Sequence, residues 1–225
     1  MAIKLLYKSG DYMSNIDVWN KNLIKDFKKL NSTLEVYDMW LDKYKEYIES
    51  AQKTIVDLGC GIGNDTMFIK QCGKKVLSVD YSDEALKIIN QNIKDANTLK
   101  MDFENKWLLE KDSADLIIAN LSLHYFNTDT TFKIINNIEN TLTNGGILIV
   151  RLNSVNDVNY GSNSLNEIEQ HYYESMNIKK RFFDRDDINY FFSNFQILTC
   201  KEENVLSRIH DKKKVVWECV FKKEY

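Results

Sequence analysis

TIVDLGCGIGNDT, at residues Thr54–Thr66, is the stretch that decides how this chain folds. It begins with β-branched residues, which predict a short buried strand. Glycines then stand at three alternate positions, Gly59, Gly61 and Gly63, and a helical pattern starts at Asn64. Glycine adopts left-handed backbone conformations and lets another molecule approach the main chain closely. A strand, a glycine turn and a helix N-terminus in this order predict a ligand site lined with unpaired N–H groups.

A dinucleotide is the first ligand to consider, and the glycine spacing argues against it. The dinucleotide fingerprint is G-x-G-x-x-G, whereas the third glycine here comes one residue early and is followed by Asn64. Asp57 also puts a carboxylate where a pyrophosphate would be repelled. That carboxylate suits a ligand with an ammonium group, and S-adenosylmethionine carries an amino acid end of this kind.

The motif VDLGCGIGNDT resembles the first motif of the class I S-adenosylmethionine-dependent methyltransferases. The resemblance implies an α/β fold with a Rossmann-like, seven-stranded, mostly parallel sheet, an antiparallel edge hairpin and helices on both faces. It also implies one domain over residues 1–225, with a helical lid at 1–50, a cofactor-binding half at 51–150 and an acceptor side with the C-terminal hairpin at 151–225. The implied cofactor is S-adenosyl-L-methionine, and its product form is S-adenosyl-L-homocysteine.

Length and composition are those of one soluble domain. The chain has 225 residues and a formal net charge of −3, so its surface offers no strong field for nucleic acid or anionic lipid. No apolar run approaches the roughly 20 residues that span a bilayer, and the N-terminus lacks the pattern of a signal peptide. The four cysteines form no C-x-x-C motif. We therefore expect a cytoplasmic monomer or weak dimer with reduced thiols, without a metal, nucleic-acid partner or membrane span.

Two helices are predicted before the glycine turn, at Asp17–Leu30 and Thr33–Ser50, from their apolar spacing. In methyltransferases of the kind this chain resembles, such helices form a lid over the cofactor. Tyr12 and Trp19 are the lid residues that we expect near the cofactor. The alternative is that both are ordinary core aromatic residues at the underside of the lid.

A second buried strand, Lys75–Asp80, ends in an acid about 20 residues after the glycine turn. A carboxylate at this position accepts hydrogen bonds from both ribose hydroxyls, and Tyr81 follows to lie along the adenosine. A third strand, Thr98–Met101, precedes Asp102 and Phe103, which resemble the family's third motif. The resemblance implies that Asp102 accepts the adenine amine; a solvent-exposed turn aspartate is the alternative. The residues predicted to bind the cofactor are Tyr12, Trp19, Asp57, Gly59, Cys60, Gly61, Gly63, Asp65, Asp80, Tyr81, Met101, Asp102, Phe103, Asn120 and Leu121.

The acceptor is expected beyond the strand Asp115–Asn120, because ligands of open α/β sheets bind at the carboxyl ends of the strands. This places Asn120, Ser122 and His124 beside the transferred methyl group. The chain contains no proline, so it lacks the Asn/Asp-Pro-Pro-aromatic and Pro-Cys motifs of enzymes that methylate amide or exocyclic nitrogen and cytosine C5. The LHYF sequence resembles methyltransferases of small molecules or peptide groups, and O-methylation is favoured.

His124 is the candidate general base, because its ordinary pKa lies near neutrality; a ring hydrogen-bonded to backbone beneath the cofactor is the alternative. Arg151, Tyr160 and Arg181 could hold an anionic acceptor, or serve as solvated or structural charges. The loop Ser154–Asn163 is rich in Asn, Ser and Gly and is expected to be mobile.

The remaining pattern predicts helices and strands that complete the sheet. Residues EIEQHYY to KKRFF resemble small bacterial methyltransferases near the tellurite-resistance group. The expected elements are helices at Ser82–Lys94, Thr130–Leu142 and Glu167–Met176, a turn at Asn144–Gly146, a strand at Ile147–Leu152, a basic turn and a helix capped by Asp184, and a hairpin of Phe195–Glu202 with Lys214–Lys222.

Two other functions stay open beside an active methyltransferase. One is a catalytically inactive partner subunit that only binds the cofactor, against which the full set Asp57, Asp80 and Asp102 speaks. The other is a nicotinamide-dependent oxidoreductase, which the glycine spacing and Asp57 disfavour.

Overall fold

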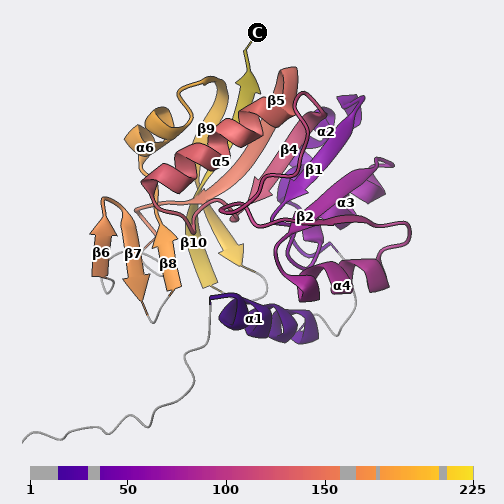
Figure 1. Cartoon of the computed structure of the whole chain (residues 1–225), viewed down its shortest axis with the longest axis horizontal. Coiled ribbons are helices and arrows are strands. Elements are labelled where there is room, and N and C mark those ends of the chain that lie inside the picture. Colours follow the sequence, from indigo (N-terminus) through magenta and orange to yellow (C-terminus); the bar gives the residue numbers. More distant parts are fainter. Residues whose placement is uncertain (1–14, 30–35, 158–165, 176–177, 208–211, 225) are drawn as a thin grey trace, which may run out of the picture.

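Seven strands form a twisted central sheet in the order β3-β2-β1-β4-β5-β10-β9, seen in the computed structural model of Figure 1. The structure describes residues 15–29, 36–157, 166–175, 178–207 and 212–224. Strands β3, β2, β1, β4 and β5 are parallel, and β10 lies antiparallel between β5 and β9. This confirms the predicted fold class. The strands are β1 (Thr54–Leu58), β2 (Val76–Asp80), β3 (Asn97–Lys100), β4 (Ala114–Asn120), β5 (Leu142–Asn153), β9 (Phe195–Ser207) and β10 (Lys212–Lys223).

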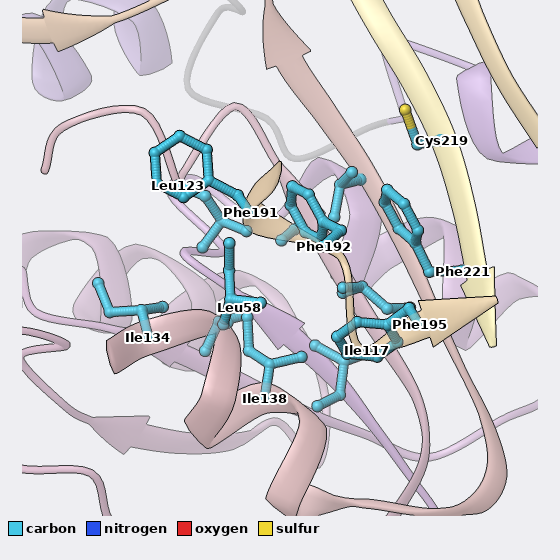
Figure 2. Packing of buried hydrophobic residues seen from close by; sticks show 14 of the residues in the cluster. Leu58, Ile117, Leu123, Ile134, Ile138, Phe191, Phe192, Phe195, Cys219 and Phe221 are labelled. Atoms are coloured by element: carbon cyan, nitrogen blue, oxygen red, sulfur yellow. The ribbon is translucent and has the colours of Figure 1, made fainter. Parts of the chain in front are cut away.

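Helices cover both faces of the sheet, and each face has its own apolar core. On one face, α5 (Thr128–Thr141) and α6 (Arg185–Phe191) pack through Ile134, Ile138 and Phe191, as Figure 2 shows. Phe192 stacks on Phe221 of β10, with ring centroids 4.4 Å apart. The other face is covered by η1 (Trp40–Tyr44), α2 (Lys45–Ser50) and α3 (Asn64–Gln71). Parallel strands between two helical layers bring the carboxyl ends of β1, β2, β4 and β5 to one edge.

Two further helices lie near that edge. In α4 (Asp83–Asn92), the side chain of Ser82 caps the N-terminus by accepting a hydrogen bond from the Ala85 amide. Helix α1 (Asn15–Lys29) runs alongside α4 in Figure 1, and Asn20 Oδ1 accepts a 2.5 Å hydrogen bond from Ser82 Oγ. The first predicted helix is therefore present, and it lies against the start of α4.

The predicted helix at Thr33–Ser50 is wrong at residues 36–39, the first of its residues that the structure describes. Residues 36–39 are not helical, and helical structure begins only at Trp40. The cause is a tertiary contact, because the side chain of Asn64 binds the backbone of Tyr37 and Asp38 and holds this segment in place. A contact across 26 residues overrides the local apolar spacing.

The predicted helix at Glu167–Met176 is also wrong, as is the basic turn after it. The chain instead forms β6 (Asn166–Glu169), β7 (Tyr172–Ser175) and β8 (Ile178–Arg181), a separate antiparallel sheet at the side of β10 in Figure 1. His171 turns the chain between β6 and β7 with a φ of 58°, in the left-handed region. The helix capped by Asp184 is confirmed as α6, where Asp184 and Asp187 form a capping box.

The predicted turn at Asn144–Gly146 lies within β5 as a local irregularity. Ala114 of β4 pairs with Leu142, and Leu116 pairs with Ile147, so the residues between them bulge out of the ladder. Gly145 has a φ of 76°, which glycine adopts at little cost.

The predicted C-terminal hairpin is confirmed. Strands β9 and β10 pair antiparallel along most of their length, and the four cysteines, all within the described ranges, are free thiols. Among the helices that the structure describes, none is long and apolar enough to cross a membrane.

Candidate active site

The glycine turn between β1 and α3 is held against the end of β2. The amides of Gly59 and Cys60 both donate to the carbonyl of Val79, at 2.7 and 3.0 Å. Gly59, Gly61 and Gly63 have φ values of 79°, 51° and 89°, so all three use the left-handed region. A β-carbon on Gly59 would lie 2.3 Å from Ser122 Cβ, whereas one on Gly61 would have no described atom within 4 Å. Gly59 thus allows close packing, and Gly61 leaves the backbone accessible to a ligand.

Three buried carboxylates surround this turn. Asp57, Asp65 and Asp80 are each less than 5% exposed. Asp57 accepts a 2.6 Å hydrogen bond from Thr66 Oγ1. Burial raises the pKa of all three groups, and the negative charge of Asp65 adds to the rise at Asp57. A ligand with positive charge would relieve this repulsion, which is the electrostatics expected for a sulfonium and an ammonium group.

Asp80 is fixed in orientation by the main chain. Its Oδ2 accepts from the Gly61 amide and its Oδ1 from the Ser82 amide, each at 2.9 Å. Each carboxylate oxygen can accept a further hydrogen bond. The geometry is compatible with the predicted ribose contact, which stays a prediction.

A segment that sequence reasoning missed lies against the same turn. Asn64 Oδ1 accepts from the amides of Tyr37 and Asp38, both at 3.0 Å, and its Nδ2 donates to the Asp38 carbonyl at 2.9 Å. Trp40 Nε1 donates to Asp65 Oδ1 at 2.9 Å. We call residues 37–40 the turn brace. The sequence signal for it was Asn64 itself, which stands where the dinucleotide fingerprint has its third glycine.

The residues after β4 form the next side of the site. Leu121 takes a φ of 54°, and its amide donates to the Arg151 carbonyl at 3.0 Å. Ser122 Oγ donates to the Leu58 carbonyl at 2.6 Å, which joins this segment to the start of the glycine turn. The Asn120 side chain bonds Asp65, and its Oδ1 is buried with no partner among the described residues. A left-handed leucine and an unsatisfied amide oxygen at one strand end are typical of a functional site.

His124 is buried beside this strand end. The side chain is 3% exposed, and its Nδ1 has no hydrogen-bond partner within the described part of the chain. Burial lowers the pKa of the imidazole well below its ordinary value, and the charges of Lys180 and Lys214 lower it further. The ring is therefore neutral at neutral pH and can accept a proton. The alternative role, a ring hydrogen-bonded to backbone, finds no support at Nδ1.

The predicted adenine side is only partly exposed to a ligand. Tyr81 is half-buried, and burial with the charge of Asp80 raises its pKa to about 12. Met101 and Phe103 belong to the apolar core. Asp102 is exposed, and its oxygens accept from the Glu104 amide at 3.0 Å and from Asn105 Nδ2 at 2.7 Å. These are the contacts of a solvent-exposed aspartate in a turn, which was the alternative interpretation. The contact of Asp102 with the adenine amine stays a prediction.

The two arginines predicted for the acceptor are already bound to carboxylates. Arg151 contacts Glu218 through Nε at 2.9 Å and Nη2 at 2.7 Å, contacts Asp38 at 2.6 Å, and lies over the Trp40 ring. Arg181 Nη2 lies 2.9 Å from Glu169 Oε2. Direct binding of an anionic acceptor by these residues stays a prediction, and the ion pairs disfavour it. Tyr12 and Tyr160 lie outside the described residues; Trp19 is in α1, with its side chain outside them.

A group of potential metal ligands lies where the turn between β6 and β7 meets the start of α6. His171 Nδ1 is 2.6 Å from Asp187 Oδ2 and 3.9 Å from Asp184 Oδ2. The two aspartates cap α6, so the group has a structural role without an ion.

Comparisons with known proteins agree with this geometry. A family model described as a methyltransferase domain matches residues 55–146. The chain is 26% identical over 159 residues to phosphoethanolamine N-methyltransferase 1 of Caenorhabditis elegans, which covers 60% of this chain and 32% of that protein. It is 28% identical over 144 residues to the tRNA N(3)-methylcytidine methyltransferase trm140 of Schizosaccharomyces pombe, covering 59% of this chain and 46% of that protein. The chain thus matches about a third to about half of these relatives' length.

Solved structures share the fold at lower identity. A methyltransferase from Anabaena variabilis has a TM-score of 0.66 at 18% identity, over 96% of this chain and 98% of that one. The 1,6-didemethyltoxoflavin-N1-methyltransferase of Burkholderia thailandensis, with bound 1,6-didemethyltoxoflavin and S-adenosylhomocysteine, has a TM-score of 0.62 at 13% identity, over 97% and 93% of the chains. With the strand order and the glycine turn, these findings show a methyltransferase domain match over residues 55–146 and the fold of the class I S-adenosylmethionine-dependent methyltransferases, and they support that family for the chain.

Proposed function

We propose that this protein transfers the methyl group of S-adenosylmethionine to a small-molecule or peptide acceptor, with a hydroxyl as the favoured nucleophile. The observation that carries the proposal is the left-handed glycine turn set among the buried carboxylates of Asp57, Asp65 and Asp80. The named acceptors of the relatives, phosphoethanolamine and tRNA, differ in size and chemistry. The substrates of these relatives therefore do not identify the acceptor of this chain.

The residues at the turn fit the cofactor. Asp80 offers acceptors for the ribose hydroxyls, and Asp57 offers negative charge toward the amino acid end. The buried Asn120 Oδ1, which lacks a partner among the described residues, offers an acceptor for an ammonium group. When bound, S-adenosylmethionine supplies a methyl group that its sulfonium has already activated. Acidic and acceptor groups around an accessible backbone suit such a cation better than they suit a pyrophosphate.

His124 is the candidate general base of the proposed reaction. Positioning of the acceptor accounts for about 7–11 kcal/mol of barrier lowering in well-oriented reactions, so a base matters mainly for an acceptor that must lose a proton. A hydroxyl is such an acceptor. The neutral ring of His124, with Nδ1 unpartnered among the described residues, can take that proton.

We also propose that residues 1–50 act as a lid over a cofactor-binding half at 51–150. Helix α1 supports this, because Asn20 contacts the cap of α4 and Phe27 packs against the cluster formed by Ile62, Ala85 and Ile88. Closure would exclude water from the methyl transfer.

Calorimetric titration with S-adenosylhomocysteine tests the cofactor assignment. We expect micromolar affinity, about −8 kcal/mol, for the unmodified chain, and a loss of about tenfold or more in Asp80→Asn. Asp83→Asn is the matched control. It removes the same charge, but from an exposed side chain three residues after Asp80. Binding of NADH in place of S-adenosylhomocysteine, or unchanged affinity in Asp80→Asn, would contradict the assignment.

Methyl transfer from isotope-labelled S-adenosylmethionine into a pool of hydroxylated and aminated small molecules and peptides tests the reaction. Labelled product in the hydroxylated fraction is the expected result. Tight cofactor binding without labelling of any fraction would favour the inactive partner subunit.

A further inference from the structure

One face of the sheet gathers polar side chains at its carboxyl edge. Side chains alternate between faces along a strand, so Asn153 shares a face with Arg151 on β5, and Lys214 shares a face with Glu218 on β10. Arg151 and Glu218 are direct cross-strand partners, and their side chains bond each other. Lys214 and Asn153 therefore lie on the same face as this ion pair, nearer to the edge where β4 and β5 end.

Strand β8 brings a second lysine toward the same place. The Arg181 amide donates to the His124 carbonyl at 2.7 Å, so β8 lies directly beside the segment that follows β4. Two residues later, the Phe183 amide donates to the Asn153 carbonyl at 2.8 Å. Lys180 precedes Arg181 on this strand. Four elements thus converge: the end of β4, the end of β5, β8 and the start of β10.

Two lysines among the described residues carry positive charge toward this convergence. Lys180 and Lys214 are half-buried, and both lower the pKa of His124. Burial and mutual repulsion lower the pKa of Lys214 to about 8, and burial lowers that of Lys180. Asp157, fully buried after β5, acts in the opposite direction on both lysines. Among the residues that the structure describes, the charges that act on the imidazole are those of these two ammonium groups.

Two buried polar atoms at this convergence point to a ligand. His124 Nδ1 and Asn153 Oδ1 have no hydrogen-bond partner among the residues that the structure describes, although their side chains are 3% and 1% exposed. Buried polar atoms are nearly always satisfied. An acceptor with a hydroxyl or amino group would satisfy them.

We propose that the acceptor carries an anionic group, a carboxylate or a phosphate, which binds Lys180 and Lys214 while the reacting group of the acceptor faces His124. This proposal rests on the proposed methyl transfer and names the chemistry of its acceptor. The arginines do not compete for the anion, because Arg151 and Arg181 are held by Glu218 and Glu169. An anion at the two lysines offsets their repulsion, and charge-assisted hydrogen bonds are the strongest available there.

The test is calorimetry on the full chain saturated with S-adenosylhomocysteine, using inorganic phosphate and acetate as separate probes at constant ionic strength. We expect one probe to bind, and the one that binds identifies the anion. Lys180→Met and Lys214→Met should each weaken that binding by about tenfold or more. The matched controls Lys179→Met and Lys213→Met remove the same charge from exposed neighbouring positions and should change the affinity less than about twofold.

A second readout is the imidazole titration of His124, followed by nuclear magnetic resonance and assigned with His124→Gln. The bound probe should raise the pKa of His124, because it offsets the lysine charges. Lys180→Arg and Lys214→Arg keep the charge, so they should retain probe binding if the methionine variants fail to fold.

The outcomes separate the two proposals. If the unmodified chain does not bind S-adenosylhomocysteine, the proposed function is contradicted. Normal S-adenosylhomocysteine binding with no response to either probe, or equal weakening by the control variants, would overturn only the anionic acceptor.

Discussion

Replacing Gly59 and Gly61 separately with alanine should affect two different properties of the protein. Both glycines have positive φ values, 79° and 51°, but a new β-carbon would meet different surroundings. At Gly59 it would lie 2.3 Å from Ser122 Cβ and 2.9 Å from Ser122 Oγ. At Gly61 no described atom would lie within 4 Å.

The expected destabilisation follows from these contacts. A left-handed conformation costs a residue with a β-carbon about 1–2 kcal/mol, and this cost applies at both positions. Overpacking costs about 1–3 kcal/mol more, and it applies only at Gly59. Gly59→Ala should therefore lower the free energy of unfolding by about 2–5 kcal/mol, and Gly61→Ala by about 1–2 kcal/mol.

Urea unfolding without ligand measures the difference in stability, and calorimetry with S-adenosylhomocysteine measures the difference in affinity for the cofactor product. Gly61→Ala should lose about tenfold or more in affinity, because its methyl group enters space next to the accessible backbone. Adding Ser122→Gly to Gly59→Ala should restore part of the stability, although the hydrogen bond from Ser122 to the Leu58 carbonyl is lost. Equal destabilisation by the two alanines, with no rescue by Ser122→Gly, would refute the packing argument.

Three further predictions concern other parts of the site and the sheet. Arg151→Met should cost about 3–5 kcal/mol in urea unfolding, because it leaves the buried Glu218 without its arginine; adding Glu218→Gln should recover part of this, and a cost near zero would contradict the ion-pair argument. Because the folded pKa of His124 lies below its ordinary value, the unfolded chain takes up a proton at this site first as the pH falls, so His124 lowers the free energy of unfolding below about pH 6.5. The raised pKa values of Asp57, Asp65 and Asp80 act in the opposite direction, so the test is the comparison by urea unfolding with His124→Gln, which should lose less stability over this range. Cys200 and Cys219 are cross-strand partners with sulfurs 3.2 Å apart, so a diazene oxidant should accept their two electrons and two protons and leave a disulfide, seen by non-reducing peptide mapping; no linked peptide would contradict this.

The sequence predicted the strand, glycine turn and helix at residues 54–71 well because their signals are local. In residues 54–66, the strand, the glycine spacing and the helix start are all encoded within a few neighbouring positions. The structure places Asp57 and Asp80 at the ends of adjacent parallel strands, as their positions after apolar runs predicted. Parallel pairing then brings the two carboxylates to the same edge.

The errors arose where distant residues decide the local structure. Residues Tyr37 and Asp38 lie within an apolar pattern of helical spacing, yet Asn64 binds their amides. The stretch after Glu167 has residues typical of a helix, but His171 adopts a left-handed turn and Tyr173 pairs with Lys180 of β8. Strand pairing is not visible in single-sequence periodicity.

The contacts of the candidate acceptor residues could not be predicted for a related reason. Arg151 was a candidate because it lies near the carboxyl end of a strand, and its carboxylate partner Glu218 lies 67 residues later on β10. Lys180 and Lys214 were passed over because each resembles an ordinary surface lysine in its own segment. Only the meeting of β8 and β10 beside His124 shows their common position.

The place of β10 between β5 and β9 has a consequence for the order of events during synthesis. Chains leave the ribosome from the N-terminus and fold in that direction, so β5 is an unpaired edge until β10 emerges. Arg151 is translated 67 residues before Glu218, and until then its guanidinium lacks that carboxylate. Unpaired edges invite pairing with other chains. A ribosome stalled between β5 and β10 should therefore display a nascent chain whose five parallel strands are assembled while β5 still exposes an open edge that chaperones can bind.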